Sequence, residues 1–201
     1  MTQEKRIAAV ITAAGMSTRM KAFKQTLPIG EKTFAEHVVD RFVRAGADPV
    51  VVVLGHRAQE VREALTGYPV TFLENPDYAT TQMFDTVKIG LDYVKDCCDR
   101  VFVTPVDVPL FSVKTLCAEL ETEAPVVIPV SDGVKGHPIL LDADILLRIL
   151  AFTGEGGLKG AVDASQAECV NVSVEDEGST QDADTQEEYR QLREYYERMQ
   201  N

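Results

Sequence analysis

The sequence has few basic residues for its size and no apolar run long enough to cross a membrane. Its 201 residues include 20 Lys and Arg against 32 Asp and Glu, a formal net charge of -12. That charge repels a nucleic-acid backbone and an anionic membrane, so neither is expected as the main partner. A membrane span needs about 20 consecutive apolar residues. We therefore expect a cytoplasmic protein with a single domain over residues 1–201.

Cysteine is scarce as well, and two familiar phosphate loops are missing. The four cysteines form no CxxC pair and have no histidine at zinc-finger intervals, so a structural zinc site or a redox pair is not expected. The chain contains neither GxxxxGK[ST] nor GxGxxG, the loops of P-loop ATPases and dinucleotide-dependent dehydrogenases. Both of these enzyme classes are excluded.

What the chain does contain is a regular alternation of short apolar runs and helical periodicities. The apolar runs predict strands at 7–13, 50–54, 70–73, 101–104, 126–130, 139–141 and 169–172. The periodicities predict helices at 34–45, 84–94, 113–120, 145–150 and 189–199. We expect Asp142 to cap the fourth helix, Thr185 and Glu188 to form a capping box before the last, and the acidic residues 175–178 to be a solvated loop.

Apolar strands that alternate with helices indicate a mostly parallel sheet with helices on both faces. The expected fold is therefore a three-layer, Rossmann-like α/β domain. In such folds ligands bind at the carboxyl ends of the strands, so the loops after the strands are where functional residues are expected.

The loop after the first strand combines small residues with positive charge. Ala14 and Gly15 let a ligand approach the backbone, Gly15 can adopt dihedral angles closed to other residues, and consecutive amides can form an anion-binding nest. Arg19, Lys21 and Lys24 then place three positive charges within six residues of an acidic protein. This loop is the predicted phosphate site.

The same loop resembles the AAGxSxRM…K…LP signature of the MobA/MocA-like nucleotidyltransferases, and within them the molybdenum cofactor cytidylyltransferases. The matching positions are Gly15, Ser17, Arg19, Met20, Lys24, Leu27 and Pro28. Lys21 departs from the signature, which usually has glycine there. The resemblance implies a fold of the nucleotide-diphospho-sugar transferase type and nucleotide contacts at Thr12, Ala13, Ala14, Gly15, Ser17, Arg19, Lys24, Asn75 and Gln82.

An acidic partner for this loop is expected at Asp107, which follows the predicted strand at 101–104. Two phosphorylated substrates repel each other, so a divalent cation is needed beside the basic side chains. In the family a D-x-P-L segment supplies the magnesium-binding aspartate, and here Asp107 stands in such a segment. The resemblance thus implies Mg²⁺ on Asp107, with Arg19, Lys24 and Asp107 as the catalytic residues.

The segment from Asn75 to Gln82 resembles a family stretch in which an asparagine turn leads into a helix. Free amides at that helix start would face a nucleotide or acceptor phosphate. Gln82 stands in place of the usual glycine, and Asp85 brings a negative charge that opposes an anion. A simple capped helix is the alternative here.

Three further segments resemble family motifs on the acceptor side. The Gly136–Pro138 segment resembles G-H-P and suggests that His137 contacts the acceptor, although a loop histidine bonded to the backbone is an alternative. Glu155 replaces the aspartate of a G-D-x-G turn, and Asp182 and Asp184 match a D-I-D-T segment. Any of these three carboxylates could join Asp107 at the metal.

These motifs together predict transfer of CMP from CTP to a phosphorylated acceptor, with molybdopterin as first choice and pyrophosphate released. The Ala-Ala-Gly sequence resembles the cytidylyltransferase branch, whereas the guanylyltransferase branch tends to show Ala-Gly-Gly. The alternatives are a GTP-using molybdopterin guanylyltransferase, a sugar-phosphate or polyol-phosphate cytidylyltransferase, a nucleotide-binding regulatory protein without turnover, and a docking module that delivers cofactor to a molybdoenzyme client.

Overall fold

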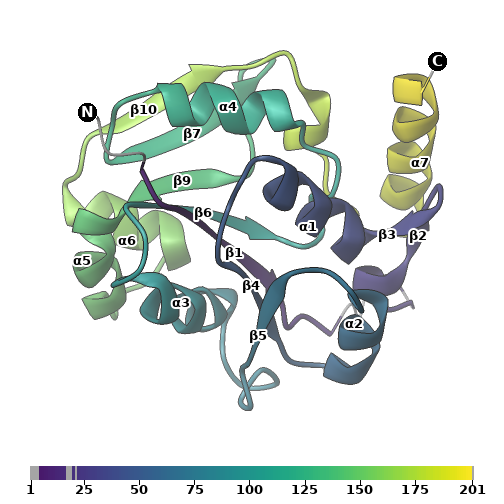
Figure 1. Cartoon of the computed structure of the whole chain (residues 1–201), viewed down its shortest axis with the longest axis horizontal. Coiled ribbons are helices and arrows are strands. Elements are labelled where there is room, and N and C mark those ends of the chain that lie inside the picture. Colours follow the sequence, from purple (N-terminus) through teal and green to yellow (C-terminus); the bar gives the residue numbers. More distant parts are fainter. Residues whose placement is uncertain (1–4, 17–19, 21, 201) are drawn as a thin grey trace.

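The computed structural model describes residues 5–16, 20 and 22–200. Its centre is an eight-stranded sheet with the order β10-β7-β9-β6-β1-β4-β5 and β8 beside β7 (Figure 1). The strands are β1 (Ile7–Ala13), β4 (Val50–Leu54), β5 (Val70–Glu74), β6 (Arg100–Pro105), β7 (Val126–Ser131), β8 (Val134–Lys135), β9 (Ile139–Asp142) and β10 (Cys169–Ser173). A small second sheet pairs β2 (Pro28–Ile29) with β3 (Lys32–Thr33). All seven predicted strands are confirmed to within two residues at each end.

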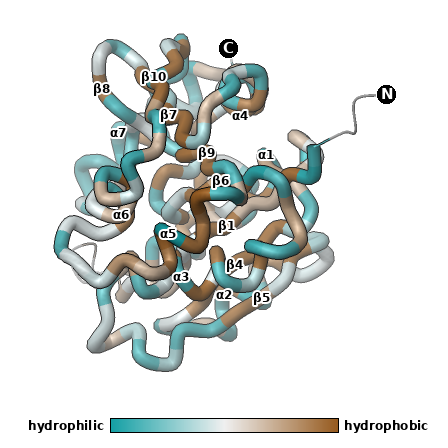
Figure 2. Tube along the Cα trace, turned by 90° about the vertical axis from the view of Figure 1, so that its left-hand side faces the viewer, coloured by the Kyte–Doolittle hydropathy of each residue, from teal (hydrophilic) through white to brown (hydrophobic). Residues whose placement is uncertain are grey.

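Helices cover both faces of the sheet, which confirms the predicted three-layer α/β architecture. They are α1 (Phe34–Arg44), α2 (Ala58–Ala64), α3 (Met83–Val94), α4 (Val113–Glu121), α5 (Leu146–Ala151), α6 (Gly157–Ser165) and α7 (Gln186–Gln200). One apolar core joins the sheet to α1, α2, α4 and α7, and the other joins it to α3, α5 and α6. In Figure 2 the strands β4, β6 and β7 are mostly hydrophobic, as expected for strands buried on both faces.

Two strands of the sheet, β8 and β9, do not follow the parallel pattern, and β8 runs antiparallel to β7. β9 runs antiparallel to both β6 and β7, whereas β1, β4, β5 and β6 are parallel neighbours. The reason is the connection after β7, a tight turn at Asp132 and Gly133 with positive φ angles of 50° and 79°. A tight turn reverses the chain, while a parallel return needs a longer crossover.

Close packing of α3 on β1 fixes the position of that helix relative to the strand ends. A Cβ added at Gly90 in α3 would lie 2.3 Å from Cγ1 of Val10 in β1, so only glycine allows this approach. The first residue of α3 consequently lies beside the end of β1, where the Thr12 hydroxyl contacts the Met83 sulfur at 3.2 Å. This contact brings the start of α3 to the predicted phosphate loop.

Two predictions about local structure were wrong. Asp142 does not cap the following helix; it accepts a 2.7 Å hydrogen bond from Nε of the buried Arg100 instead. The segment 175–178 is not simply a solvated loop, because Asp176 is buried and accepts bonds from Ser112 N and Thr115 Oγ1. In both cases the carboxylate accepts a hydrogen bond from a buried side chain elsewhere in the fold.

Candidate active site

The loops after β1 and β6 meet because these two strands are parallel neighbours, with Thr12 opposite Pro105. The backbone N–H of Val106 donates to the Thr12 carbonyl at 3.0 Å and ties the two loops together. The predicted phosphate loop and the Asp107 segment are therefore adjacent at the carboxyl edge of the sheet, where α/β folds bind ligands.

Lys24 lies between two carboxylates at this edge. Its Nζ donates to Asp107 Oδ2 at 3.0 Å and to Asp184 Oδ1 at 2.5 Å, although Asp184 is 160 residues away in sequence. The side chains of Lys24, Asp107 and Asp184 are only 10%, 19% and 24% exposed. The sequence left three candidates for a second carboxylate beside Asp107. Of these, Asp184 is the one that binds the same Lys24 ammonium as Asp107.

The charges of this cluster influence one another's protonation. Burial lowers the pKa of Lys24, but the carboxylates of Asp107 and Asp184 more than reverse that effect, so the net pKa is raised and the ammonium stays charged. The pKa of Asp182 is raised by partial burial and by its neighbours Asp107, Asp184 and Glu188. Negative charge is concentrated here, and Lys24 neutralises part of it.

Local structure before α7 explains how Asp184 reaches Lys24. Ala183 is fully buried and anchors the segment in the core. The predicted capping box is confirmed, because Glu188 N donates to Thr185 Oγ1 at 3.2 Å and Thr185 N donates to Glu188 Oε2 at 2.7 Å. Asp184 N donates to the same Glu188 carboxylate at 2.8 Å, which fixes the backbone beside Lys24.

The phosphate loop is supported by a side chain that sequence reasoning missed. Gln25 is buried, and its Nε2 donates to the Gly15 carbonyl at 2.9 Å and to the Ala13 carbonyl at 3.4 Å. Its place directly after Lys24 in the signature was the available signal. Gly15 does not use the positive φ that glycine permits, and a Cβ added there would meet no described atom within 4 Å. Two predicted contacts of this loop, Ser17 and Arg19, lie outside the described residues, as does Lys21.

The loop after β4 supports the other side of the same turn. His56 N donates to the Ala14 carbonyl at 3.3 Å. A Cβ added at Gly55 would come within 2.9 Å of both Ala14 and Tyr78, so the chain segments are in close contact. The sequence gives no signal for this support, because β4 and its loop resemble no motif of the family.

Asn75 and Gln82 lie on the α3 side of the site, and Asn75 is buried whereas Gln82 is exposed. The Asn75 amide donates to Thr81 Oγ1 and Thr86 Oγ1 at 2.9 and 3.0 Å. Gln82 N donates to the Asp85 carboxylate at 3.0 Å, and this bond is the main cause of the lowered Asp85 pKa. The amide of Gln82 is therefore capped by Asp85, as the alternative interpretation of this segment proposed.

His137 is placed near Asp107, whereas Glu155 is not connected to the cluster. Burial lowers the pKa of His137, and the Asp107 carboxylate and a backbone bond at Val103 offset part of that shift. Its backbone N–H donates to the Ser179 carbonyl at 2.7 Å. Glu155 is exposed, and among the described residues no hydrogen bond or ion pair joins it to Lys24 or Asp107.

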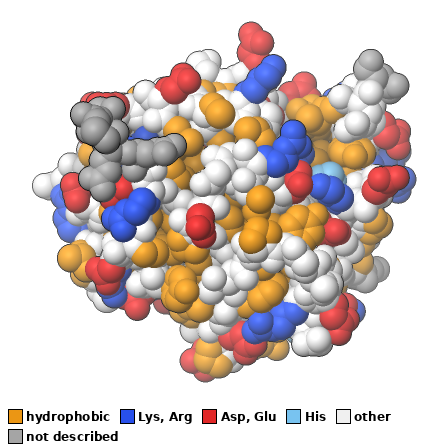
Figure 3. Space-filling model, viewed as in Figure 1, with side chains coloured by type: hydrophobic (Ala, Val, Ile, Leu, Met, Phe, Trp, Pro, Cys, Tyr) orange, Lys and Arg blue, Asp and Glu red, His pale blue; other side chains and the backbone are white. Residues whose placement is uncertain are grey.

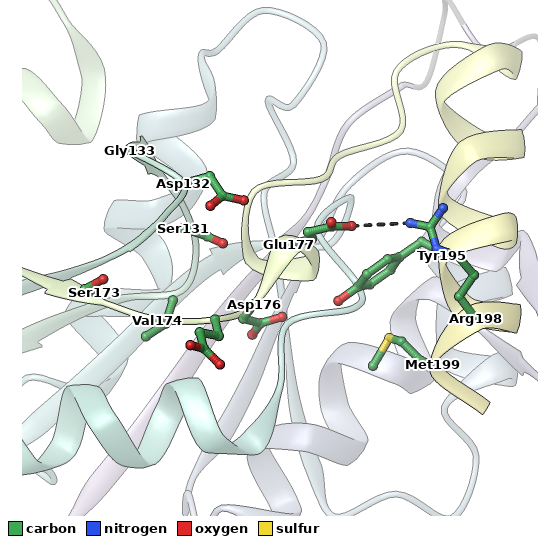
Figure 4. Close-up of a pocket in the computed structure, with 11 residues that line it drawn as sticks. Ser131, Asp132, Gly133, Ser173, Val174, Asp176, Glu177, Tyr195, Arg198 and Met199 are labelled. Carbon is green, nitrogen blue, oxygen red and sulfur yellow. Dashed lines mark hydrogen bonds and ion pairs between the residues drawn. The ribbon is translucent and has the colours of Figure 1, made fainter. Parts of the chain in front are cut away.

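A separate groove of about 840 Å³ lies between the end of α7 and the β7–β8 turn, and contains none of the predicted site residues (Figure 4). Glu177 and Arg198 form an ion pair of 3.3 Å across it, which the close-up shows as a dashed line. Acidic and basic side chains are interspersed over the molecular face in Figure 3. In the part of the chain that the structure describes, no three His, Cys, Asp or Glu side chains form a preformed metal site.

Comparison with known proteins places the chain among nucleotidyltransferases. The family model of the MobA-like NTP transferase domain matches residues 9–169. The chain is 25% identical over 193 residues to the molybdenum cofactor cytidylyltransferase of Escherichia coli, covering 94% of this chain and 97% of that protein. It is also 34% identical over 112 residues to the bifunctional protein GlmU of Staphylococcus carnosus, matching 55% of this chain but only 24% of that longer protein.

Solved structures agree on the fold. A nucleotidyl transferase from Methanothermobacter superposes with a TM-score of 0.84 at 24% identity and covers 98% of this chain and 100% of that one. Rv0371c of Mycobacterium tuberculosis, solved in complex with manganese, superposes with a TM-score of 0.75 at 24% identity, covering 94% and 98% of the two chains. Both identities are low, so these structures establish the architecture alone.

Proposed function

Because this chain belongs to the MobA-like NTP transferase family and is a nucleotidyltransferase, we propose that it transfers CMP from CTP to molybdopterin. The observation that carries the proposal is the meeting of Lys24, Asp107 and Asp184 beside the Ala13–Gly15 turn. The choice of CTP rests on the Ala-Ala-Gly sequence of that turn, and the choice of acceptor on the similarity to the Escherichia coli enzyme along nearly the whole chain.

The two carboxylates fit a magnesium ion. Both accept hydrogen bonds from one ammonium nitrogen, so their oxygens already converge on a single positive charge. Mg²⁺ is commonly held by one or two carboxylates together with substrate phosphates. Asp107 and Asp184 would hold the ion, which would supply charge neutralisation between the triphosphate and the acceptor phosphate.

The turn and the basic side chains near it bind the triphosphate and the transferred phosphoryl group. The Ala13–Gly15 turn carries the triphosphate, Arg19 holds its β and γ phosphates with its planar guanidinium, and Lys24 accompanies the transferred phosphoryl group. Thr12 and Asn75 keep the turn and the helix start in place, and Gln82 faces the nucleotide. His137 and Asp182 lie on the acceptor side, with Glu155 at its margin.

The reaction then needs no strong general base. A terminal phosphate oxygen of the acceptor, already ionised near neutral pH, forms a bond to the α-phosphorus. The bond from that phosphorus to the oxygen bridging to the β-phosphorus breaks, and pyrophosphate leaves. Positioning and charge neutralisation are sufficient to lower the barrier of such a transfer.

Pyrophosphate release, assayed with each nucleotide and acceptor, tests the proposal. We expect CTP with molybdopterin to be the best pair, and Lys24→Ala and Asp107→Ala to lower turnover at least ~100-fold. Lys95→Ala is the matched control, since it removes a surface ion pair with Asp92 instead. Wild-type turnover in either site variant would overturn the assignment of the site.

Other outcomes of the assay identify the alternatives. Faster turnover with GTP, or with a sugar or polyol phosphate, would replace the proposed substrates. Nucleotide binding without any pyrophosphate release would indicate a regulatory protein. A cytoplasmic location and a molybdoenzyme client belong to the same proposal; no helix in the described part of the chain is long and apolar enough to cross a membrane.

A further inference from the structure

A groove of about 520 Å³ lies between α1, the start of α4 and the end of α7 (Figure 1). Among the described residues that line it, none belongs to the carboxylate cluster of Lys24, Asp107 and Asp184. Four basic side chains from β3, α1 and α4 line it, namely Lys32, Arg41, Arg44 and Lys114. In a chain with 20 basic and 32 acidic residues, this local concentration of positive charge is a candidate site for an anion.

Arg41 in α1 has unused hydrogen-bond donors at this groove. Its Nη1 donates to the His37 carbonyl at 2.8 Å and to His37 Nδ1 at 3.2 Å, and its Nε donates to the Phe111 carbonyl. The remaining two N–H groups of a guanidinium are on Nη2. In the described part of the chain Nη2 makes no hydrogen bond, and Arg41 lines the groove. The Nη2 donors are therefore available to an occupant.

The positive charge of Arg41 is only partly compensated inside the protein. Among the described residues no carboxylate forms an ion pair with Arg41. Burial lowers the pKa of its guanidinium, and the charges of Asp40 and Asp176 offset that effect only in part. A buried cation without a paired anion is costly, so an anion in the groove would stabilise the folded protein.

The three carboxylates that line the groove leave this charge in place. Asp40 already pairs with Lys32 at 2.9 Å and with Arg44 at 3.7 Å. Asp176 is buried and accepts its hydrogen bonds from the start of α4, and Glu175 is exposed. An incoming anion thus meets a guanidinium that these carboxylates do not occupy.

Two further groups suit the oxygens of a phosphate. Lys114 is exposed in the first turn of α4 and pairs with no described carboxylate. The Tyr195 hydroxyl accepts a 3.2 Å bond from Gly178 N, which leaves its own hydrogen to donate. A carboxylate would be satisfied by the Arg41 fork alone, whereas a phosphate has charge and oxygens for all three groups.

We propose that this groove is a second anion site, which binds a phosphate group, free or carried by a small molecule, through Arg41, Lys114 and Tyr195. The site lies apart from the carboxylate cluster and does not depend on the proposed function. Tyr195 belongs to α7, whereas Arg41 and Lys114 belong to α1 and α4, so a bound phosphate connects three helices. Small-molecule sites have volumes of roughly 300–1,000 Å³, and the groove falls within that range.

Methionine methyl groups report on the two sites separately. Met199 lines the groove, whereas Met83 contacts Thr12 beside the phosphate loop. With isotope-labelled methionine methyl groups, we expect inorganic phosphate to shift the Met199 NMR signal in a saturable manner at constant ionic strength. A Met199 signal that does not move, or that moves without saturation, would overturn the proposal.

A double substitution with a matched control tests the named side chains. Lys114→Ala/Tyr195→Phe removes one charge and one hydroxyl at the groove, and Lys159→Ala/Tyr93→Phe removes the same groups at exposed positions elsewhere. The first should weaken the phosphate affinity measured at Met199 at least ~10-fold, because charge-assisted bonds carry the binding. Turnover of CTP should stay unchanged in both variants, and the control should keep the wild-type phosphate affinity. An unchanged affinity in the groove variant would contradict the assignment.

Arg41→Lys keeps the charge and removes the Nη2 donors, so it should also weaken the phosphate affinity at Met199. If this buried substitution prevents folding, the double variant at the exposed Lys114 and at Tyr195 decides the question. An Arg41→Lys protein that is folded and binds phosphate like the wild type would argue against Arg41 as a ligand.

Further titrations identify the source of the phosphate group. If CMP saturates the Met199 signal at lower concentration than inorganic phosphate or pyrophosphate, the site takes a phosphorylated small molecule; the opposite order supports a free ion. A normal CTP turnover with a silent Met199 would remove the groove site and leave the transferase assignment standing. A saturable Met199 response without any nucleotide turnover would support the groove site and contradict the proposed transfer.

Discussion

Removing the ammonium of Lys24 is the perturbation that examines the carboxylate cluster most directly. In Lys24→Met the side chain keeps much of its shape, but Asp107 and Asp184 lose the cation between them. Their bonded oxygens lie 3.0 and 2.5 Å from the Lys24 nitrogen, so they are close together, and two unit negative charges at ~5 Å repel each other by roughly 3 kcal/mol at an effective dielectric constant of about 20. Because both are partly exposed, solvent screening reduces this value.

The expected loss of stability is therefore about 2 kcal/mol, between that of an exposed ion pair and that of a broken buried pair. For a chain of this length such a loss lowers Tm by roughly 4–8 °C. The assay is thermal unfolding in the presence of a chelator. The double variant Lys24→Met/Asp184→Asn should recover most of the loss, because it removes one of the two repelling charges.

The same variant reports on the metal site. If Asp107 and Asp184 hold the divalent cation, they bind it more tightly once Lys24 no longer competes for them. We expect Mg²⁺ or Mn²⁺ to raise Tm more in Lys24→Met than in the wild-type protein, and to have no such extra effect in Lys24→Met/Asp184→Asn. Two results would refute this reasoning: a Lys24→Met protein as stable as the wild type, or an equal metal response in all three proteins.

Three other predictions follow from single contacts. Gly15→Ala should weaken nucleotide binding at least ~10-fold in calorimetry with no change in Tm, because the added methyl meets no described atom; a fall in Tm would contradict this. Folding raises the pKa of Asp182 through burial and neighbouring carboxylates, so its ionisation costs stability above about pH 3.9 and increasingly up to the raised pKa. Asp182→Asn should consequently raise Tm at neutral pH and lose that gain in acid, and a pH-independent effect would count against it. Arg100→Met should cost about 3 kcal/mol in denaturant unfolding, since this buried side chain bonds Asp142 and three backbone carbonyls, and a cost under 1 kcal/mol would show that the network is dispensable.

The strand pattern and the first motif were accessible from the sequence because both depend on neighbouring residues. An apolar run buried on both faces identifies a strand wherever it pairs, and the predicted strands were confirmed. Helices α2 and α6 escaped detection because neither carries a repeated stripe of large apolar residues: α2 buries only Val61, and α6 buries the small or polar residues Ala161 and Ser165 beside Val162. The direction of β9 escaped as well, because it depends on a two-residue turn.

The assembly of the site was decided by tertiary structure. The sequence by itself determined that Lys24 and Asp107 follow strand ends, and it left Glu155, Asp182 and Asp184 as equal candidates for a second carboxylate. Only the packing of Ala183 in the core and the capping of α7 by Thr185 and Glu188 bring Asp184 within 2.5 Å of Lys24. The physical reason is that a motif specifies side-chain chemistry at one point of the chain, whereas a contact between residues 160 positions apart depends on how every intervening element packs.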